Sequence, residues 1–161
     1  MQVLFVVCAV TGLLLAACTK TEMKPETSIV SAGTAANISI IKKRSNLLVS
    51  HSWIYQGFYF HYVDKRHKGD PQYVRGASNN VINLDDTKYI FSKNGTFVEY
   101  DGGYTYPGTW KFFDTAASLL ILNYQYRNDN DSIQVLNNSH CNYTASMGYH
   151  SKSYTELIPA L

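Results

Sequence analysis

The sequence predicts an all-β domain, an antiparallel barrel of eight strands in up-and-down order, preceded by a short N-terminal helix. Three observations support this fold class. Aromatic and β-branched residues abound, with thirteen tyrosines, whereas only 16% of the residues are charged. Turn residues recur between short apolar segments, and eight such segments follow one another, mostly with short connections. Eight sequential antiparallel strands can close into a barrel, which removes exposed sheet edges.

The chain begins with an apolar segment, residues 3–17, that is short for a membrane-spanning helix. It ends in Leu15-Ala16-Ala17, and Cys18 follows directly. This sequence resembles the lipobox of bacterial lipoproteins. The resemblance implies a signal peptide over residues 1–17, acylation of Cys18 and attachment to a membrane of the cell envelope through that lipid. Thr19, in place of Asp after the cysteine, favours the outer membrane; an uncleaved apolar anchor is the alternative.

A tether and a helix are expected next. Residues 18–39 are rich in Thr, Ser and Ala and lack a strong period, so we expect a flexible tether. Residues 40–50 are expected to form the short helix, because Ile40, Ile41, Leu47 and Leu48 fall at i, i+1, i+7 and i+8. The barrel domain is then expected to cover residues 40–161.

The strands follow in order, with one long connection. Gly57 lies inside the first strand and indicates a bulge or bend. Residues 64–86 are too long for a hairpin turn and suit a lid or binding loop, with a small strand at Tyr73-Val74 as an option. Strands are expected at 52–63, 87–92, 96–100, 108–113, 119–126, 132–136, 140–146 and 152–158.

The turn at Lys93-Asn94-Gly95 offers two registers for the hairpin around it. A two-residue Asn-Gly loop pairs Phe91 with Val98. A three-residue loop with Gly95 left-handed pairs Phe91 with Phe97. We favour the second register, because it places Tyr89, Phe91 and Phe97 on one face.

Short motifs along the domain resemble the lipocalin-like domains of bacterial lipoproteins, over about residues 44–161. The resemblance implies a barrel with a cup for a small ligand and a long first loop at its mouth. The motifs are Leu47-Leu48 with Ser52-Trp53, Phe91 with Gly95-Thr96-Phe97, Gly108-Thr109-Trp110, and Ile133 with Leu136.

Tyrosines are the main candidate ligand contacts, because each offers an apolar ring with a polar tip. The same rings can instead fill a small barrel, and the tryptophans can serve as core plugs. By the resemblance, Lys65, Arg66, Lys68 and Arg75 on the long loop are expected to meet an anionic or sugar-like ligand or a protein partner; a solvated loop is the alternative. The candidate ligand-binding residues are Tyr55, Tyr59, Tyr73, Arg75, Phe91, Trp110, Tyr124 and Tyr143.

Several functional classes are not supported by the sequence. After residue 45, nine Lys and Arg face ten Asp and Glu, which does not suit a nucleic-acid-binding domain. The five histidines lack metal-ligand spacing, and no phosphate loop or nucleophile elbow occurs, so no metal, cofactor or enzyme activity is expected. Cys141 is the one cysteine of the expected domain and suits a buried thiol on a strand.

These observations lead to one functional hypothesis and one alternative. The first is a non-enzymatic lipoprotein of the cell envelope that binds a small amphipathic ligand in its barrel. The alternative is an envelope module for protein–protein interaction or inhibition whose barrel is filled. A continuous cavity of roughly 300 Å³ or more favours the first.

Overall fold

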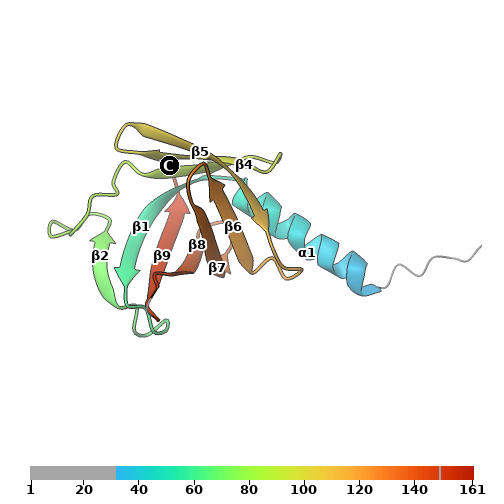
Figure 1. Ribbon diagram of the computed structural model, residues 1–161, viewed down its shortest axis with the longest axis horizontal. Coiled ribbons are helices and arrows are strands. Elements are labelled where there is room, and N and C mark those ends of the chain that lie inside the picture. The colour runs from blue at the N-terminus through green and yellow to red at the C-terminus, as the bar shows by residue number, and fades with distance from the viewer. Residues whose placement is uncertain (1–31, 149) are drawn as a thin grey trace, which may run out of the picture.

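The computed structural model describes residues 32–148 and 150–161. Helix α1 (Ala32–Leu48) projects from one end of a barrel, and the strands run back and forth along the barrel axis (Figure 1). The expected signal peptide, Cys18 and the tether up to residue 31 lie outside the described residues.

The strands after α1 are all antiparallel to their neighbours. They are β1 (Ser52–Phe60), β2 (Asp70–Val74), β3 (Lys88–Phe91), β4 (Thr96–Asp101), β5 (Tyr104–Phe112), β6 (Leu119–Tyr124), β7 (Asn128–Leu136), β8 (Cys141–Ser146) and β9 (Lys152–Pro159).

Eight of these strands, β1 and β3 to β9, close into a ring because β1 pairs with β9 as well as with β3. This confirms the predicted eight-stranded antiparallel barrel. Strand β2 lies outside the ring and pairs only with β1, over Gly57–Phe60. The first half of β1, Ser52–Ile54, pairs with β3. Strand β2 therefore pairs with the part of β1 that the short strand β3 does not reach. The small strand that the sequence offered as an option at Tyr73-Val74 is confirmed.

The hairpin between β3 and β4 has the three-residue loop. Ile90 pairs with Val98 and Phe91 with Phe97. Gly95 has a φ of 82°, in the left-handed region that glycine adopts without strain. Tyr89, Phe91 and Phe97 are all buried. The favoured register is thus confirmed.

Gly57 marks an irregularity in β1, as expected. The pairing of β1 with β9 shifts register between Tyr55 and Gly57, and the pairing with β2 shifts between Phe58 and Tyr59. Such shifts bend a strand and help a sheet to close. After the shift, Phe58 rather than Gly57 follows Tyr55 on the inner wall.

Several predicted boundaries were wrong. Helix α1 begins at Ala32 rather than at residue 40, so residues 32–39, assigned to the tether, are helical; alanines there favour a helix. Strand β1 ends at Phe60, three residues early. Strands β5 and β7 begin at Tyr104 and Asn128, four residues before the predicted starts, because pairing with β4 and β6 continues past Pro107 and past a polar segment.

The end of the barrel beside α1 is packed shut. Trp53 is fully buried, and its Nε1 donates a hydrogen bond to the carbonyl oxygen of Leu48 at 2.8 Å. Trp110 Nε1 donates to the carbonyl oxygen of Ser92 at 3.0 Å, and its ring meets Phe91 edge to face. These side chains form the core at this end, and the opposite end of the barrel is here called the mouth.

Candidate functional site

A cavity of about 520 Å³ occupies the mouth half of the barrel. The mouth is formed by the turns β4–β5, β6–β7 and β8–β9, because every strand that begins or ends in these turns points its other end toward α1. Six side chains supply most of the apolar wall: Tyr55, Phe58, Tyr89, Leu122, Tyr124 and Tyr143.

The inner wall is built largely by alternation along the strands, which is interrupted at the register shifts of β1 and β7. On β4, Phe97 and Glu99 are buried, whereas Val98 is half-buried and Tyr100 is exposed. On β7, Asp131 and Ile133 are buried while Asn130 is exposed. Toward α1 the inward side chains are apolar and pack together; toward the mouth they are carboxyl and hydroxyl groups.

A chain of hydrogen bonds crosses one side of the cavity. The Tyr89 hydroxyl donates to Glu99 Oε1 at 3.2 Å. The hydroxyls of Tyr55 and Tyr89 lie 2.9 Å apart, so Tyr55 is the donor in that bond, since the Tyr89 proton is directed at Glu99. Burial raises the pKa of Tyr55 to about 12 and that of Tyr89 well above its usual value. Both phenols therefore stay neutral and act as hydrogen-bonding groups on the wall.

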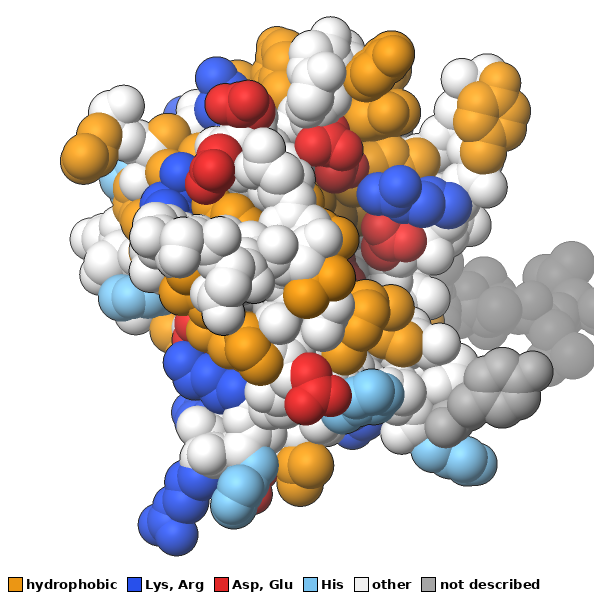
Figure 2. Space-filling model, turned by 90° about the vertical axis from the view of Figure 1, so that its left-hand side faces the viewer, with side chains coloured by type: hydrophobic (Ala, Val, Ile, Leu, Met, Phe, Trp, Pro, Cys, Tyr) orange, Lys and Arg blue, Asp and Glu red, His pale blue; other side chains and the backbone are white. Residues whose placement is uncertain are grey.

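Arg127, in the β6–β7 turn, is held by two carboxylates. Its Nη2 lies 3.2 Å from Glu99 Oε2, and its Nε lies 3.1 Å from Asp129 Oδ2. The guanidinium carbon lies 3.9 Å from the centre of the Tyr124 ring, within the range of a cation–π contact. Figure 2 faces the end of the molecule away from α1 and shows acidic side chains, in red, on either side of a basic one, in blue.

Asp131 is the carboxyl group without a partner. It is 2% exposed and lines the cavity, yet its side chain forms no hydrogen bond or ion pair with a described residue. Burial raises the pKa of Asp131 to about 8; the nearby charge of Asp129 acts in the same direction and that of Arg127 opposes it. The Tyr124 hydroxyl is also buried; it lies near Glu99 and Arg127 but forms no hydrogen bond of ordinary geometry with a described residue.

The structure brings three of the eight candidate ligand residues to the cavity: Tyr55, Tyr124 and Tyr143. Phe91 and Trp110 belong to the packed end of the core rather than to the cavity wall. Tyr59 lies on the outer face of the barrel, where its hydroxyl donates to Glu156 Oε2 at 3.3 Å.

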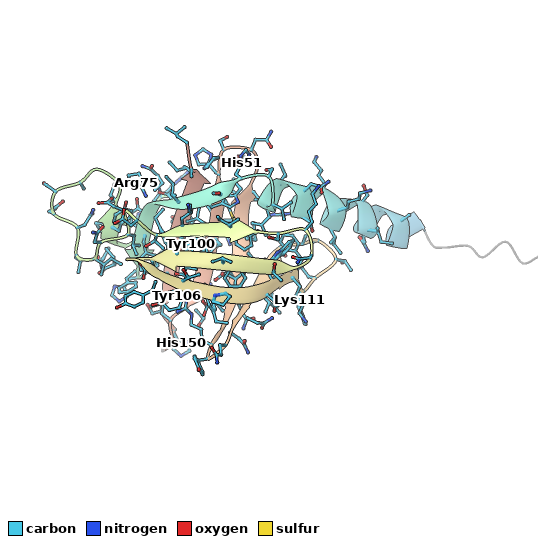
Figure 3. All side chains as sticks on the ribbon, turned by 90° about the horizontal axis from the view of Figure 1, so that it is seen from above. His51, Arg75, Tyr100, Tyr106, Lys111 and His150 are labelled. Carbon is cyan, nitrogen blue, oxygen red and sulfur yellow. The ribbon has the colours of Figure 1, made fainter. Side chains whose placement is uncertain are left out.

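Tyr73 and Arg75 join the β2 region to β1 and to the segment that precedes β3. The Tyr73 hydroxyl donates to Asp85 Oδ1 at 2.7 Å. Arg75 Nε donates to the carbonyl oxygen of Tyr55 at 2.6 Å, and Figure 3 shows Arg75 beside β2 at the edge of the barrel. Both side chains thus stabilise the strands outside the cavity wall and do not line the cavity.

The long loop does not place its basic residues at the cavity. Lys68 Nζ lies 2.7 Å from Glu156 Oε1 on the outer face, and Asp64 accepts hydrogen bonds from the backbone of Arg66 and His67. None of the four basic loop side chains lines the cavity within the part of the chain that the structure describes. The loop instead supplies β2, because pairing with β1 satisfies its backbone groups.

The charged residues of the cavity were missed at the sequence level. Glu99 falls on the expected strand 96–100 but is not among the candidate site residues, and Arg127 and Asp131 fall in the connection between the expected strands 119–126 and 132–136. The available signal was the alternation of Asp129, Asp131 and Ile133, a period of two that continues β7 into its polar half. A run of polar residues usually indicates a loop, but a strand that lines a polar cavity has polar residues on its inner face.

Residues 32–148 and 150–161 contain no cluster of His, Cys, Asp and Glu suited to a metal ion. Figure 3 shows His51 beside the end of α1 and His150 at the far side of the barrel, so these two histidines do not meet. No helix within the described ranges has the length and apolar character needed to cross a membrane. Cys141 is buried, as expected, and burial raises the pKa of its thiol to about 12.

Comparison with known proteins supports the architecture. No protein-family model matches the chain, and no curated protein matches its sequence. The crystal structure of a DUF4847 family protein from Bacteroides vulgatus ATCC 8482 is similar, with a TM-score of 0.52 and 16% sequence identity, over 71% of this chain and 95% of that one. At this identity the similarity concerns the fold, and it agrees with a lipocalin-like barrel.

Proposed function

We propose that this protein is a non-enzymatic lipoprotein of the cell envelope that binds a small amphipathic ligand inside its barrel. The observation that carries the proposal is the cavity of about 520 Å³ in the mouth half. Binding sites for small molecules typically have volumes of about 300–1,000 Å³, with apolar walls and a few placed polar groups.

The wall of the cavity has this mixed character. Rings of Tyr55, Tyr124 and Tyr143 supply apolar surface, and phenol and carboxyl groups stand between them. An amphipathic molecule can bury its apolar part against the rings and hydrogen-bond at its polar end. The alternative function, a protein–protein interaction or inhibitor module, was tied to a filled barrel, and the cavity favours the ligand-binding hypothesis over it.

The envelope part of the proposal rests on the sequence. The segment ending in Leu15-Ala16-Ala17-Cys18 resembles a lipobox, and acylation of Cys18 would hold the barrel at a membrane. The non-enzymatic part rests on the lack of a nucleophile elbow or phosphate loop in the sequence.

A cavity-filling variant tests ligand binding directly. Ala145 lines the cavity, so Ala145→Trp should fill it, whereas Ala116 lies exposed in the β5–β6 turn and Ala116→Trp should leave it open. Native mass spectrometry is performed on the full chain extracted from its own host. We expect a retained small molecule in the wild type and in Ala116→Trp, and its loss in Ala145→Trp. A wild-type protein that carries no small molecule, or equal retention in both variants, would contradict the proposal.

A further inference from the structure

The charged groups around the cavity do not balance. Glu99, Asp129 and Asp131 all line it, while Arg127 is the one cationic side chain on its wall among the described residues. Arg127 is already shared between Glu99 and Asp129. The excess carboxyl group is therefore Asp131, the most deeply buried of the three.

Asp131 lacks the partners that a buried carboxyl group normally has. The residue is 2% exposed, and its side chain forms no ion pair or hydrogen bond with a described residue. Buried ionisable groups are as a rule paired or hydrogen-bonded, because taking a charge out of water is costly. A cationic ligand group beside Asp131 would supply the missing counter-charge.

Aromatic rings surround the same space. Tyr55, Phe58, Tyr124 and Tyr143 line the cavity with Asp131, and the Tyr124 ring already holds the Arg127 guanidinium at 3.9 Å. The faces of aromatic rings attract cations, and the attraction strengthens where water is excluded. A carboxyl group flanked by aromatic rings is the chemistry that recognises an organic ammonium ion.

An anionic ligand does not suit this wall. A carboxylate or phosphate would add negative charge to a wall whose one cationic side chain among the described residues, Arg127, already faces two carboxylates. The basic residues of the long loop, which were expected to meet an anion, lie elsewhere; Lys68 is bound to Glu156 on the outer face.

We propose that the cavity selects a small organic ammonium ion, with the cationic nitrogen against Asp131 and the apolar part among the tyrosine rings. This inference rests on the proposed function, since it names the ligand class of the same site. It also assigns a role to the buried Tyr124 hydroxyl, whose oxygen can accept a hydrogen bond from an ammonium N–H.

Binding of such a cation should depend on pH, because a protonated Asp131 cannot offset its charge. The titratable or charged groups that face Asp131 are Tyr55 from β1, Asp129 on β7, Cys141 and Tyr143 from β8, and Arg127 from the β6–β7 turn. Tyr89, Glu99 and Tyr124 complete the titratable lining. Burial keeps the tyrosines and the cysteine neutral, so the proton lost when the cation binds comes from Asp131.

Matched probes test the ligand class with the full chain purified in a neutral detergent. Two carbon skeletons are used, and each is tested as an amine, an alcohol and an acid. The indole set is tryptamine, tryptophol and indole-3-propionate, and the alkyl set is hexylamine, hexanol and hexanoate. Affinity is measured by isothermal titration calorimetry at pH 6 and pH 8. We expect the amine of at least one set to bind with an affinity about tenfold or more above that of its alcohol. We also expect this amine to bind more tightly at pH 8 than at pH 6.

Two variants assign the effect to Asp131. Asp131→Asn should lower amine affinity about tenfold or more and abolish its pH dependence, while the affinity for alcohols is retained. Asp86→Asn, at an exposed carboxyl group that does not line the cavity, should match the wild type. Calorimetry in buffers of different ionisation enthalpy should show proton release by the wild type and none by Asp131→Asn.

The outcomes separate the two proposals. Binding of alcohols or acids without a preference for amines overturns the ammonium inference and leaves the ligand-binding function standing. Amine binding that Asp131→Asn does not weaken also overturns the inference. If no probe binds, the inference is overturned, and the retained-ligand experiment on the host protein decides the function by itself.

Discussion

Asp131→Asn should make the barrel more stable at alkaline pH relative to the wild type. In the folded protein the pKa of Asp131 is raised from 3.8 to about 8, mainly because the side chain is 2% exposed on the cavity wall. The folded state therefore holds a proton that the unfolded chain releases between these two pH values. Stability is lost as pH rises through this interval, because the unfolded state binds fewer protons there.

The magnitude follows from the size of the pKa change. One pKa unit corresponds to about 1.36 kcal/mol, so the change from 3.8 to about 8 costs the folded state up to about 6 kcal/mol well above pH 8. Asparagine has a similar shape and no charge to bury. The free energy of unfolding of Asp131→Asn, relative to the wild type, should therefore rise by about 3–5 kcal/mol between pH 4 and pH 8.5.

Urea denaturation at a series of pH values, followed by tryptophan fluorescence, measures this difference. Because the difference in unfolding free energy is compared between pH values, any pH-independent cost of burying the asparagine amide cancels. Asp86→Asn serves as the control, because the Asp86 carboxyl group is exposed. If the difference between Asp131→Asn and the wild type stays the same from pH 4 to pH 8.5, Asp131 is not a buried, unpartnered acid.

Three further predictions concern the fold and its anchor. Gly95→Val should destabilise the protein by about 1–3 kcal/mol, because a β-branched residue resists the φ of 82° in the β3–β4 turn, whereas Lys93→Val should have little effect in the same thermal melts; equal melting temperatures would contradict the turn geometry. Trp110→Ala should cost about 3–5 kcal/mol in chemical denaturation, against under about 0.5 kcal/mol for the exposed Tyr126→Ala, and a negligible loss at Trp110 would remove it from the core. Cys18→Ala should release the protein from the membrane fraction and abolish labelling by fatty acid; continued labelling would refute the lipid anchor.

The barrel could be predicted because its strands carry local signals. Turn residues at Lys93-Asn94-Gly95 and aromatic residues on one face of β3 and β4 fix the first hairpin and its register. Gly57 indicates the bulge at which β1 bends. These features depend on neighbours in sequence, so they can be recognised without knowledge of the fold.

The charged part of the cavity could not be predicted in the same way. An acidic residue such as Asp131 is usually exposed on a strand, and its burial here depends on barrel closure, which brings Tyr55 of β1 near β7. The pairing of Arg127 with Glu99 joins residues 28 positions apart and depends on barrel closure. The positions of Phe91 and Trp110 depend on depth in the barrel, which strand alternation alone does not specify.

The central claim is that the mouth half of the barrel is an open cup that holds a small molecule. A crystal structure of the full chain tests this claim most directly, provided that the protein is purified from its own host under conditions that retain any bound small molecule. We expect electron density for a small molecule between Tyr55, Tyr143 and Asp131, with a ligand nitrogen about 3 Å from the carboxyl group. Side chains that meet across this space and leave no room for a ligand would contradict the account.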